Sequence, residues 1–237
     1  MIIEYLNWDS DFFGIKIGQV RCSQAELNNA DLIELFKQAK RDQYRLLYFI
    51  GDRDLHLDNV ILEDFNGKLV DRKIIFGGVI DDTQEDTSLV EEYHSTVVAP
   101  ALEQLAYISA EFSRFKLDVN FKKADFKRLY QVWITNSVQK VIADKVFVII
   151  PNEKIQGMIT LSVKNGVGVI GLLAIDDQSK GKGFGKQLVN QVKKYLYAQG
   201  VDSVEVATQS ANVNACRFYE KCGLREKVVS HIYHFWI

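Results

Sequence analysis

The sequence predicts an α/β (α+β) protein with a mixed, mostly antiparallel central sheet and a smaller N-terminal α/β domain. Three observations support this prediction. Apolar strand-like runs are joined by short turns, amphipathic helices follow them, and a glycine-rich loop connects one strand to one helix. We expect an N-terminal domain over residues 1–100 and a C-terminal domain over residues 101–237.

The N-terminal part has the order helix (30–44), strand (45–51), helix ending at Gly67 (57–67) and strand (68–80). The end of the chain repeats this order. One hypothesis is that the N-terminal domain is a degenerate copy of the same half-fold that has lost its glycine-rich loop. The alternative is that any α/β chain produces such an order by chance. A shared strand order in the structure is the criterion that separates the two.

Residues 81–100 are acidic, follow no steady period and end at Pro100, so they mark the domain boundary. The turns PNE (151–153) and KNG (164–166) predict two hairpins. The elements expected beyond the boundary are, in order, helices over 101–115 and 125–142, strands over 145–150, 154–163 and 166–175, a helix from Phe184 to Gly200, a strand over 203–208, a helix over 211–222 and a strand region over 225–237.

The composition is that of an ordinary globular protein, 47% hydrophobic and 25% charged, with a net charge of −2. It offers no basic surface for nucleic acid. The three cysteines, Cys22, Cys216 and Cys222, show no CxxC spacing, which argues against a disulfide framework or a zinc site and fits a reducing compartment. His231 and His234 fall on opposite faces of a strand and cannot share an ion, so we expect no metal.

The N-terminus has neither the basic nor the apolar region of a signal peptide. No window approaches the ~18 apolar residues of a membrane span. We therefore expect a cytoplasmic protein without a membrane partner.

The stretch KGKGFGKQL, residues 180–188, places three glycines at a strand-to-helix junction. It lacks the Lys-Ser/Thr pair of a Walker loop and the G-x-G-x-x-G spacing of a Rossmann loop. Glycines that permit positive φ, next to the free N–H groups of a helix N-terminus and several lysines, suit a diphosphate held as a binding handle. A merely flexible loop is the alternative.

This loop resembles the [R/Q]-x-x-G-x-G loop of the GNAT superfamily of N-acetyltransferases, with Lys180 at the position of the usual Arg or Gln. Downstream, NVNACRFYEKCGL is similar to the Asn/Tyr helix of that superfamily, with Asn212, Ala215, Tyr219 and Gly223 at matching positions. The order of elements from about residue 112 is also that of the superfamily. The resemblance implies a GNAT fold that binds acetyl-CoA and an acetyl transfer by direct attack of an amine on the thioester.

The resemblance implies a catalytic role for Tyr219, which we expect at the edge of the buried face of its helix, with Ala211, Ala215, Phe218 and Cys222 in the core stripe. Tyr219 would donate a proton or a hydrogen bond to the departing thiolate. For Asn212, contact with coenzyme A and capping of the helix both stay open. The residues expected to bind acetyl-CoA are Leu173, Ala174, Ile175, Lys180, Gly181, Lys182, Gly183, Phe184, Gly185, Lys186, Asn212 and Tyr219.

Segments 6–20, 111–121 and 129–148 resemble sugar-nucleotide N-acetyltransferases. The implied acceptor is the amine of a nucleotide-linked amino-deoxysugar, and a homodimer is expected. Phe12 and Phe13 are candidates for stacking on a base or sugar, and Arg114 is a candidate for pairing with a diphosphate.

No general base can be named. The side chain of Glu205 faces away from those of its apolar neighbours in the strand. Three further carboxylates, those of Asp9, Glu63 and Asp71, belong to the N-terminal part. Solvent is an adequate base for a weakly basic amine. Two other functions stay open. The protein acetylates a protein amine or another small amine, or it is a silent acetyl-CoA-binding module in which Tyr219 serves only packing.

Overall fold

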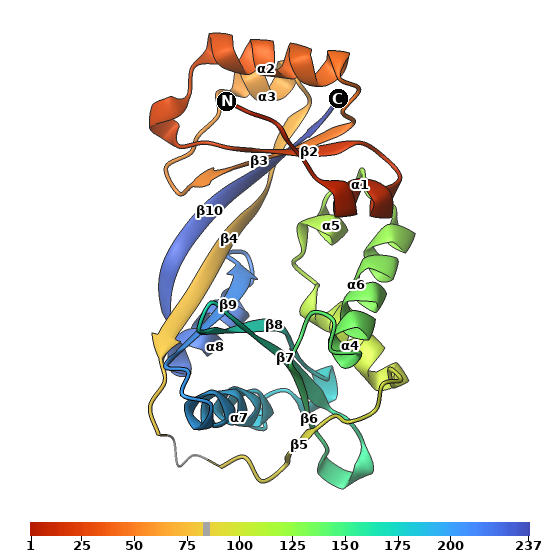
Figure 1. Cartoon of the computed structure of the whole chain (residues 1–237), viewed down its shortest axis with the longest axis vertical. Helices are drawn as coiled ribbons and strands as arrows, with labels where there is room; N and C mark the ends of the chain where they lie inside the picture. Colours follow the sequence, from red (N-terminus) through yellow and green to blue (C-terminus); the bar gives the residue numbers. More distant parts are fainter. Residues whose placement is uncertain (83–85) are drawn as a thin grey trace. The chain divides into compact units, whose positions relative to one another are not determined.

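The computed structural model describes residues 1–82 and 86–237, which form two compact units (Figure 1). Unit 1 consists of Met1–Ile74, Gln209–Ala211 and Val228–Ile237, and unit 2 of Ile75–Thr208 and Asn212–Lys227. The sequence placed the division in the segment 81–100, of which residues 83–85 lie outside the described part. The two compact units divide inside two long strands, and the end of the last strand belongs to unit 1. Domains over residues 1–100 and 101–237 stay a prediction.

Unit 1 is a small sheet covered by two helices. Strand β2 pairs antiparallel with β1 and parallel with β3, and β3 pairs antiparallel with β10. The elements of the unit are β1 (Glu4–Tyr5), α1 (Asn7–Phe13), β2 (Ile17–Arg21), α2 (Asn29–Arg41), β3 (Leu46–Asp52), α3 (Asn59–Asp64), the first part of β4 (Gly67–Val79) and the last part of β10 (Arg225–Trp236).

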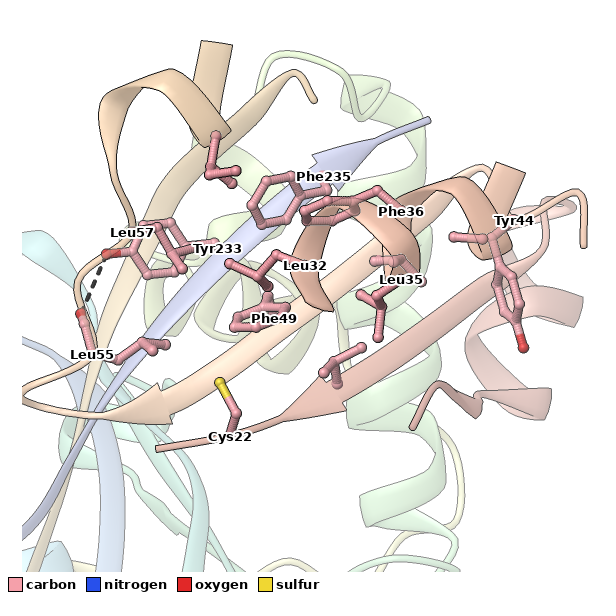
Figure 2. Close-up of a cluster of buried hydrophobic side chains, with 14 residues drawn as sticks. Cys22, Leu32, Leu35, Phe36, Tyr44, Phe49, Leu55, Leu57, Tyr233 and Phe235 are labelled. Atoms are coloured by element: carbon pink, nitrogen blue, oxygen red, sulfur yellow. Dashed lines mark hydrogen bonds between the residues drawn. The ribbon is translucent and has the colours of Figure 1, made fainter. Parts of the chain in front are cut away.

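The core of unit 1 forms where the apolar stripe of α2 packs on the sheet (Figure 2). The Asn28 side chain caps α2 by accepting a hydrogen bond from Ala30 N at 2.9 Å. Phe36 on the buried stripe lies with its ring centroid 4.5 Å from the rings of both Phe65 and Phe235. These aromatic contacts fix α2 against β10, the strand that arrives from the far end of the sequence.

Unit 2 contains the remaining elements, and its strand order is β4-β9-β8-β7-β6-β5. Strands β8 and β9 pair parallel, while β5 to β8 pair antiparallel in turn, as the sequence predicted for a mixed, mostly antiparallel sheet. The elements are β5 (Val90–Glu92), α4 (Pro100–Ser109), α5 (Arg114–Leu117), α6 (Lys123–Val138), β6 (Lys145–Ile149), β7 (Gly157–Lys164), β8 (Val167–Ile175), α7 (Phe184–Ala198), β9 (Ser203–Gln209) and α8 (Val213–Lys221).

The two halves of the chain share one strand order. In the first, α2 connects the parallel strands β2 and β3, and α3 then leads to β4. In the second, α7 connects the parallel strands β8 and β9, and α8 then leads to β10. The neighbour of β3 is β10, and the neighbour of β9 is β4, so each half contributes part of its last strand to the other unit. This order is what a duplication predicts, and a degenerate half-copy stays our proposal.

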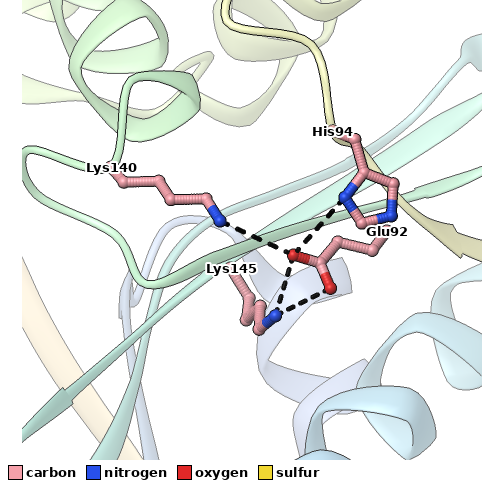
Figure 3. A network of polar contacts seen from close by, with 4 residues as sticks. All are labelled: Glu92, His94, Lys140 and Lys145. Atoms are coloured by element: carbon pink, nitrogen blue, oxygen red, sulfur yellow. Dashed lines mark hydrogen bonds and ion pairs between the residues drawn. The ribbon is translucent and has the colours of Figure 1, made fainter.

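Strand β5, which the sequence did not predict, ends at an ion-pair network around Glu92 (Figure 3). Lys145 Nζ lies 2.8 and 2.7 Å from the two carboxylate oxygens of Glu92. Lys140 and His94 lie farther away, at 3.9 and 4.0 Å. The hydrogen bond with Glu92 raises the pKa of Lys145, so the pair ties β5 to β6 with both charges partly buried.

Replacing Glu92 by glutamine is expected to lower the free energy of unfolding by about 1 kcal/mol at neutral pH, because Lys145 loses its partly buried partner. A lysine whose pKa is raised by folding stabilises the folded state at pH values below its ordinary pKa of about 10.4. This contribution is lost as the pH rises through the pKa of the folded state. The difference between Glu92→Gln and wild type should therefore shrink above pH ~10. Urea unfolding across pH measures this, with Glu111→Gln, at the exposed pair with Lys116, as control. Equal losses in both variants would contradict the prediction.

Among the described residues, no helix combines the length and the apolar character that a bilayer crossing requires.

Candidate active site

The glycine-rich loop lies between β8 and α7, after a single 3-10 turn over Asp177–Ser179. Gly181 and Gly183 have φ of +82° and +79°, and a Cβ at either position would meet open space. These two glycines are therefore required by backbone conformation and not by packing. The resulting loop exposes its backbone to solvent in unit 2.

Helix α7 begins at this loop without a side-chain cap. Gly183 is the N-cap residue in the left-handed conformation, and the first intrahelical bond runs from Gln187 N to Gly183 O. The N–H groups of Phe184 and Gly185 thus have no carbonyl partner within the helix. Together with the helix dipole they form an anion-binding end.

The lysines around the loop differ in their contacts. Lys180 Nζ forms an ion pair with Asp177 Oδ1 at 2.5 Å, so the residue that replaces the usual Arg or Gln is held at the 3-10 turn. Lys182 and Lys186 are both exposed. All three carry positive charge close to the end of α7.

The pairing of β8 with β7 is irregular at Thr160 of β7. The register shifts between Ile159 and Leu161, and the buried Thr160 hydroxyl accepts a hydrogen bond from Leu172 N at 2.9 Å. A Cβ at Gly171 would lie 2.9 Å from that hydroxyl oxygen, so a side chain there would have to displace the Thr160 hydroxyl. The side chain of Thr160 thus replaces a backbone acceptor and makes a β-bulge.

Beyond the bulge, β8 and β9 no longer pair. The parallel register between described residues ends at Ile170 and Val206, although β8 continues to Ile175. Asp176 N donates to Gln156 O, and hydrogen-bonded positions alternate along an antiparallel ladder, so Ala174 N also faces β7. The N–H groups of Leu173 and Ile175 therefore face the edge that β9 has left.

Helix α8 carries the Asn and Tyr of the sequence motif. Asn212 caps the helix, since its side-chain oxygen accepts from Ala215 N at 3.1 Å. This contact gives Asn212 the capping role that the sequence left open beside contact with coenzyme A.

Tyr219 is more buried than the sequence indicated. It is 5% exposed and is the buried residue of α8, whereas Ala211 is exposed and Phe218 is half-buried. Its ring packs 5.8 Å from Phe76 of β4. Burial raises the pKa of Tyr219 well above its ordinary value, and the electrostatic effect of Cys222 adds a smaller contribution in the same direction. The phenol therefore stays protonated through the physiological range and can donate a hydrogen bond.

The three parts of the site meet at Gly185, in the first turn of α7. A Cβ at this position would lie 3.1 Å from the Phe218 ring of α8 and 3.8 Å from Ile175 Cγ1 of β8. The uncapped helix end, the end of β8 beyond its pairing with β9 and the helix that carries Tyr219 are thus brought together within unit 2.

The substrate candidates are divided between the units. Phe12 stacks on the exposed ring of Trp8 at 5.0 Å, and Phe13 packs edge-on against Phe12, both in unit 1. Arg114 is in unit 2, at the start of α5, with its guanidinium 4.6 Å from the Phe115 ring. Their role in binding a substrate stays a proposal.

The candidate bases make other contacts or belong to unit 1. Glu205 forms an ion pair with Lys227 at 3.0 Å. Asp9 accepts a hydrogen bond from the Tyr48 hydroxyl at 3.2 Å in unit 1, where Glu63 is exposed and Asp71 is buried. None of these contacts identifies a general base.

In the described part of the chain, no three His, Cys, Asp or Glu side chains are grouped so that they could hold a metal ion. His231 Nδ1 lies 2.9 Å from Leu55 O, and the fully buried His234 stacks on Tyr48 at 4.9 Å.

This arrangement agrees with the comparison to known proteins. The family model for the acetyltransferase (GNAT) family matches residues 110–224, a range that contains β8, the loop, α7 and Tyr219. Residues 110–224 thus form a GNAT-family acetyltransferase domain.

Relatives and solved structures extend the likeness beyond the matched range. The dTDP-fucosamine acetyltransferase of Escherichia coli O6:H1 is 26% identical over 224 residues, which cover 93% of this chain and 92% of the relative. A functionally unknown conserved protein from Staphylococcus epidermidis has a TM-score of 0.62 at 11% identity, with 98% and 90% of the two chains covered. A GCN5-related N-acetyltransferase from Sphaerobacter thermophilus has a TM-score of 0.55 at 14% identity, with 98% and 75% covered. The two structures show the fold alone.

Thr160 is a residue of this GNAT site that the sequence analysis missed. Its one available signal is a hydroxyl in the apolar run GMITL, which also fits an ordinary strand. Only the pairing of β7 with β8 brings it to Leu172 N.

Replacing Thr160 by the isosteric valine is expected to lower the free energy of unfolding by about 1–3 kcal/mol, because the buried N–H of Leu172 loses its acceptor. We also expect a lower kcat, since the bulge directs the N–H groups of Leu173 and Ile175. Urea unfolding and steady-state kinetics measure the two effects. Thr160→Ser keeps the hydroxyl and should retain most of kcat, so equal kcat values for both variants would contradict this assignment.

Proposed function

We propose that this GNAT protein is an acetyl-CoA-dependent N-acetyltransferase that acetylates the amine of a nucleotide-linked amino-deoxysugar. The observation that carries the reaction is the separation of β8 from β9 beside the uncapped end of α7 and Tyr219. It leaves backbone donors, an anion-binding end and a neutral phenol in one part of unit 2.

The residues present fit acetyl-CoA. The diphosphate suits the N–H groups of the Gly181–Gly185 loop, to which Lys180, Lys182 and Lys186 add positive charge. The buried side-chain oxygen of Gln187 in the same helix has no hydrogen-bond partner among the described residues, and a ligand N–H or O–H would satisfy it. When bound, acetyl-CoA supplies a thioester carbonyl to attack.

The chain's own groups then have separate tasks. The N–H groups of Leu173 and Ile175, which face away from β7, would donate to the oxygen that becomes negative as the amine attacks. Ala174 would contribute packing, because its N–H faces β7. Tyr219 would hydrogen-bond the departing sulfur. Its raised pKa favours stabilisation of a thiolate by hydrogen bonding over full proton transfer.

The acceptor class rests on the relative from Escherichia coli, a dTDP-fucosamine acetyltransferase that this chain matches over nearly the whole of both sequences. We assign acceptor recognition to the N-terminal part, with the Trp8–Phe12 stack and Phe13 as aromatic candidates and Arg114 of unit 2 as the diphosphate partner. A homodimer is part of this proposal.

The test is release of free thiol from acetyl-CoA over a panel of dTDP- and UDP-linked amino sugars, with simple amines and a lysine peptide as comparison substrates. We expect the highest kcat/KM for one nucleotide-amino-sugar. Turnover of only the simple amines or the peptide would replace the acceptor class. Coenzyme A binding without turnover of any amine would make the chain a silent binding module.

A further inference from the structure

A buried hydroxyl precedes the diphosphate loop. Ser179, the last residue of the 3-10 turn, is 3% exposed, and its hydroxyl donates to Gln156 Oε1 at 2.5 Å. The next residue, Lys180, is exposed, as are Gly181, Lys182 and Gly183. Ser179 is therefore the last buried residue before the exposed glycine loop.

Gln156 joins this contact to the end of β8. Its carbonyl accepts from Asp176 N at 2.8 Å, and its N–H donates to Ile149 O at 2.9 Å. The side-chain Nε2 donates to Pro151 O at 3.3 Å. One residue directly before β7 thus holds both ends of the segment Asp176–Ser179, which connects the end of β8 to the loop.

The loop itself offers little that could fix its conformation. Gly181 and Gly183 meet no atom at the Cβ position, and the N-cap of α7 lacks a side-chain hydrogen bond. Glycine loses more conformational freedom on ordering than any other residue, so an exposed glycine loop needs an external anchor to keep its N–H groups convergent. The Gln156–Ser179 pair lies next to the loop and can supply that anchor.

We propose that Gln156 and Ser179 are positioning residues that hold the glycine loop in the conformation that binds the diphosphate of coenzyme A. The inference rests on the proposed function. It separates two tasks in the site. The pair acts on donor affinity through the loop, while the β8 bulge and Tyr219 act on the reacting thioester.

The test measures coenzyme A affinity by calorimetry in Ser179→Ala, Gln156→Met and the double variant. We expect each single change to raise the coenzyme A Kd about fivefold or more. The double variant should bind coenzyme A no more weakly than the weaker-binding single variant, because each single change removes the same contact. With S-acetylpantetheine, which lacks the diphosphate, kcat/KM should stay at the wild-type value in all three. With acetyl-CoA, KM should rise while kcat changes little.

Ser137→Ala is the matched control, because this buried hydroxyl donates to Trp133 O at 2.9 Å within α6. It should leave the coenzyme A Kd unchanged. If Ser179→Ala fails to fold, Gln156→Met alone decides the outcome. If the wild-type protein and the variants bind coenzyme A equally well, this inference alone is overturned. Equal losses of kcat/KM with acetyl-CoA and with S-acetylpantetheine would also overturn this inference alone. Wild-type protein that does not bind coenzyme A would overturn the proposed function as well.

Discussion

Replacing Tyr219 by phenylalanine is expected to lower kcat about 100-fold with little change in the KM for acetyl-CoA, the range typical for loss of a positioned proton or hydrogen-bond donor. The ring is buried against Phe76, and phenylalanine preserves that packing. The change therefore removes only the hydroxyl. No hydrogen bond between described residues involves this hydroxyl, so its loss leaves no protein group without a partner.

The pH dependence gives a second measurement on the same residue. Burial raises the pKa of Tyr219, so the hydroxyl stays protonated up to and beyond the ordinary tyrosine value of about 10. We expect the kcat profile of wild type to lack a falling limb from Tyr219 below that pH. Tyr233→Phe, which removes a buried hydroxyl in unit 1, is the control and should keep kcat. A kcat for Tyr219→Phe within threefold of that control would remove Tyr219 from the reaction.

Local sequence patterns were sufficient for much of this fold. Asn165 and Gly166 have φ of +51° and +77°, the conformation of the predicted hairpin turn, and Gly200 ends α7 with φ of +70°. Gly181 and Gly183 likewise adopt the positive φ that the loop requires. These features depend on a few adjacent residues, which is why a single sequence predicts them.

Features that depend on distant partners were not predictable in this way. Strand β5 is three residues long and mostly polar, and only its pairing with β6 makes it a strand. The face of α8 that is buried depends on its contact with β4, so Tyr219 lies in the core and not at its edge. Thr160 and Gln156 act through Leu172 and Ser179, which are 12 and 23 residues away. No periodicity in the sequence encodes such pairs.

Replacing Gly183 by alanine is expected to raise the KM and Kd for acetyl-CoA by about tenfold or more, which corresponds to the loss of one charge-assisted hydrogen bond. Gly183 has φ of +79°, and an alanine in this region costs roughly 1–2 kcal/mol. The chain can relieve that strain by turning the peptide next to Gly183, which would redirect the first N–H groups of α7 away from the diphosphate.

The same helix supplies the control. Gly200, just beyond the other end of α7, has φ of +70°, is exposed and also meets no atom at the Cβ position. Gly200→Ala therefore carries a similar backbone cost at a position remote from the loop. We expect both variants to lose similar free energy of unfolding, while only Gly183→Ala loses affinity for coenzyme A in calorimetry. Equal affinities would mean that the loop binds through its lysines, and the assignment of the diphosphate to the N–H groups of α7 would be wrong.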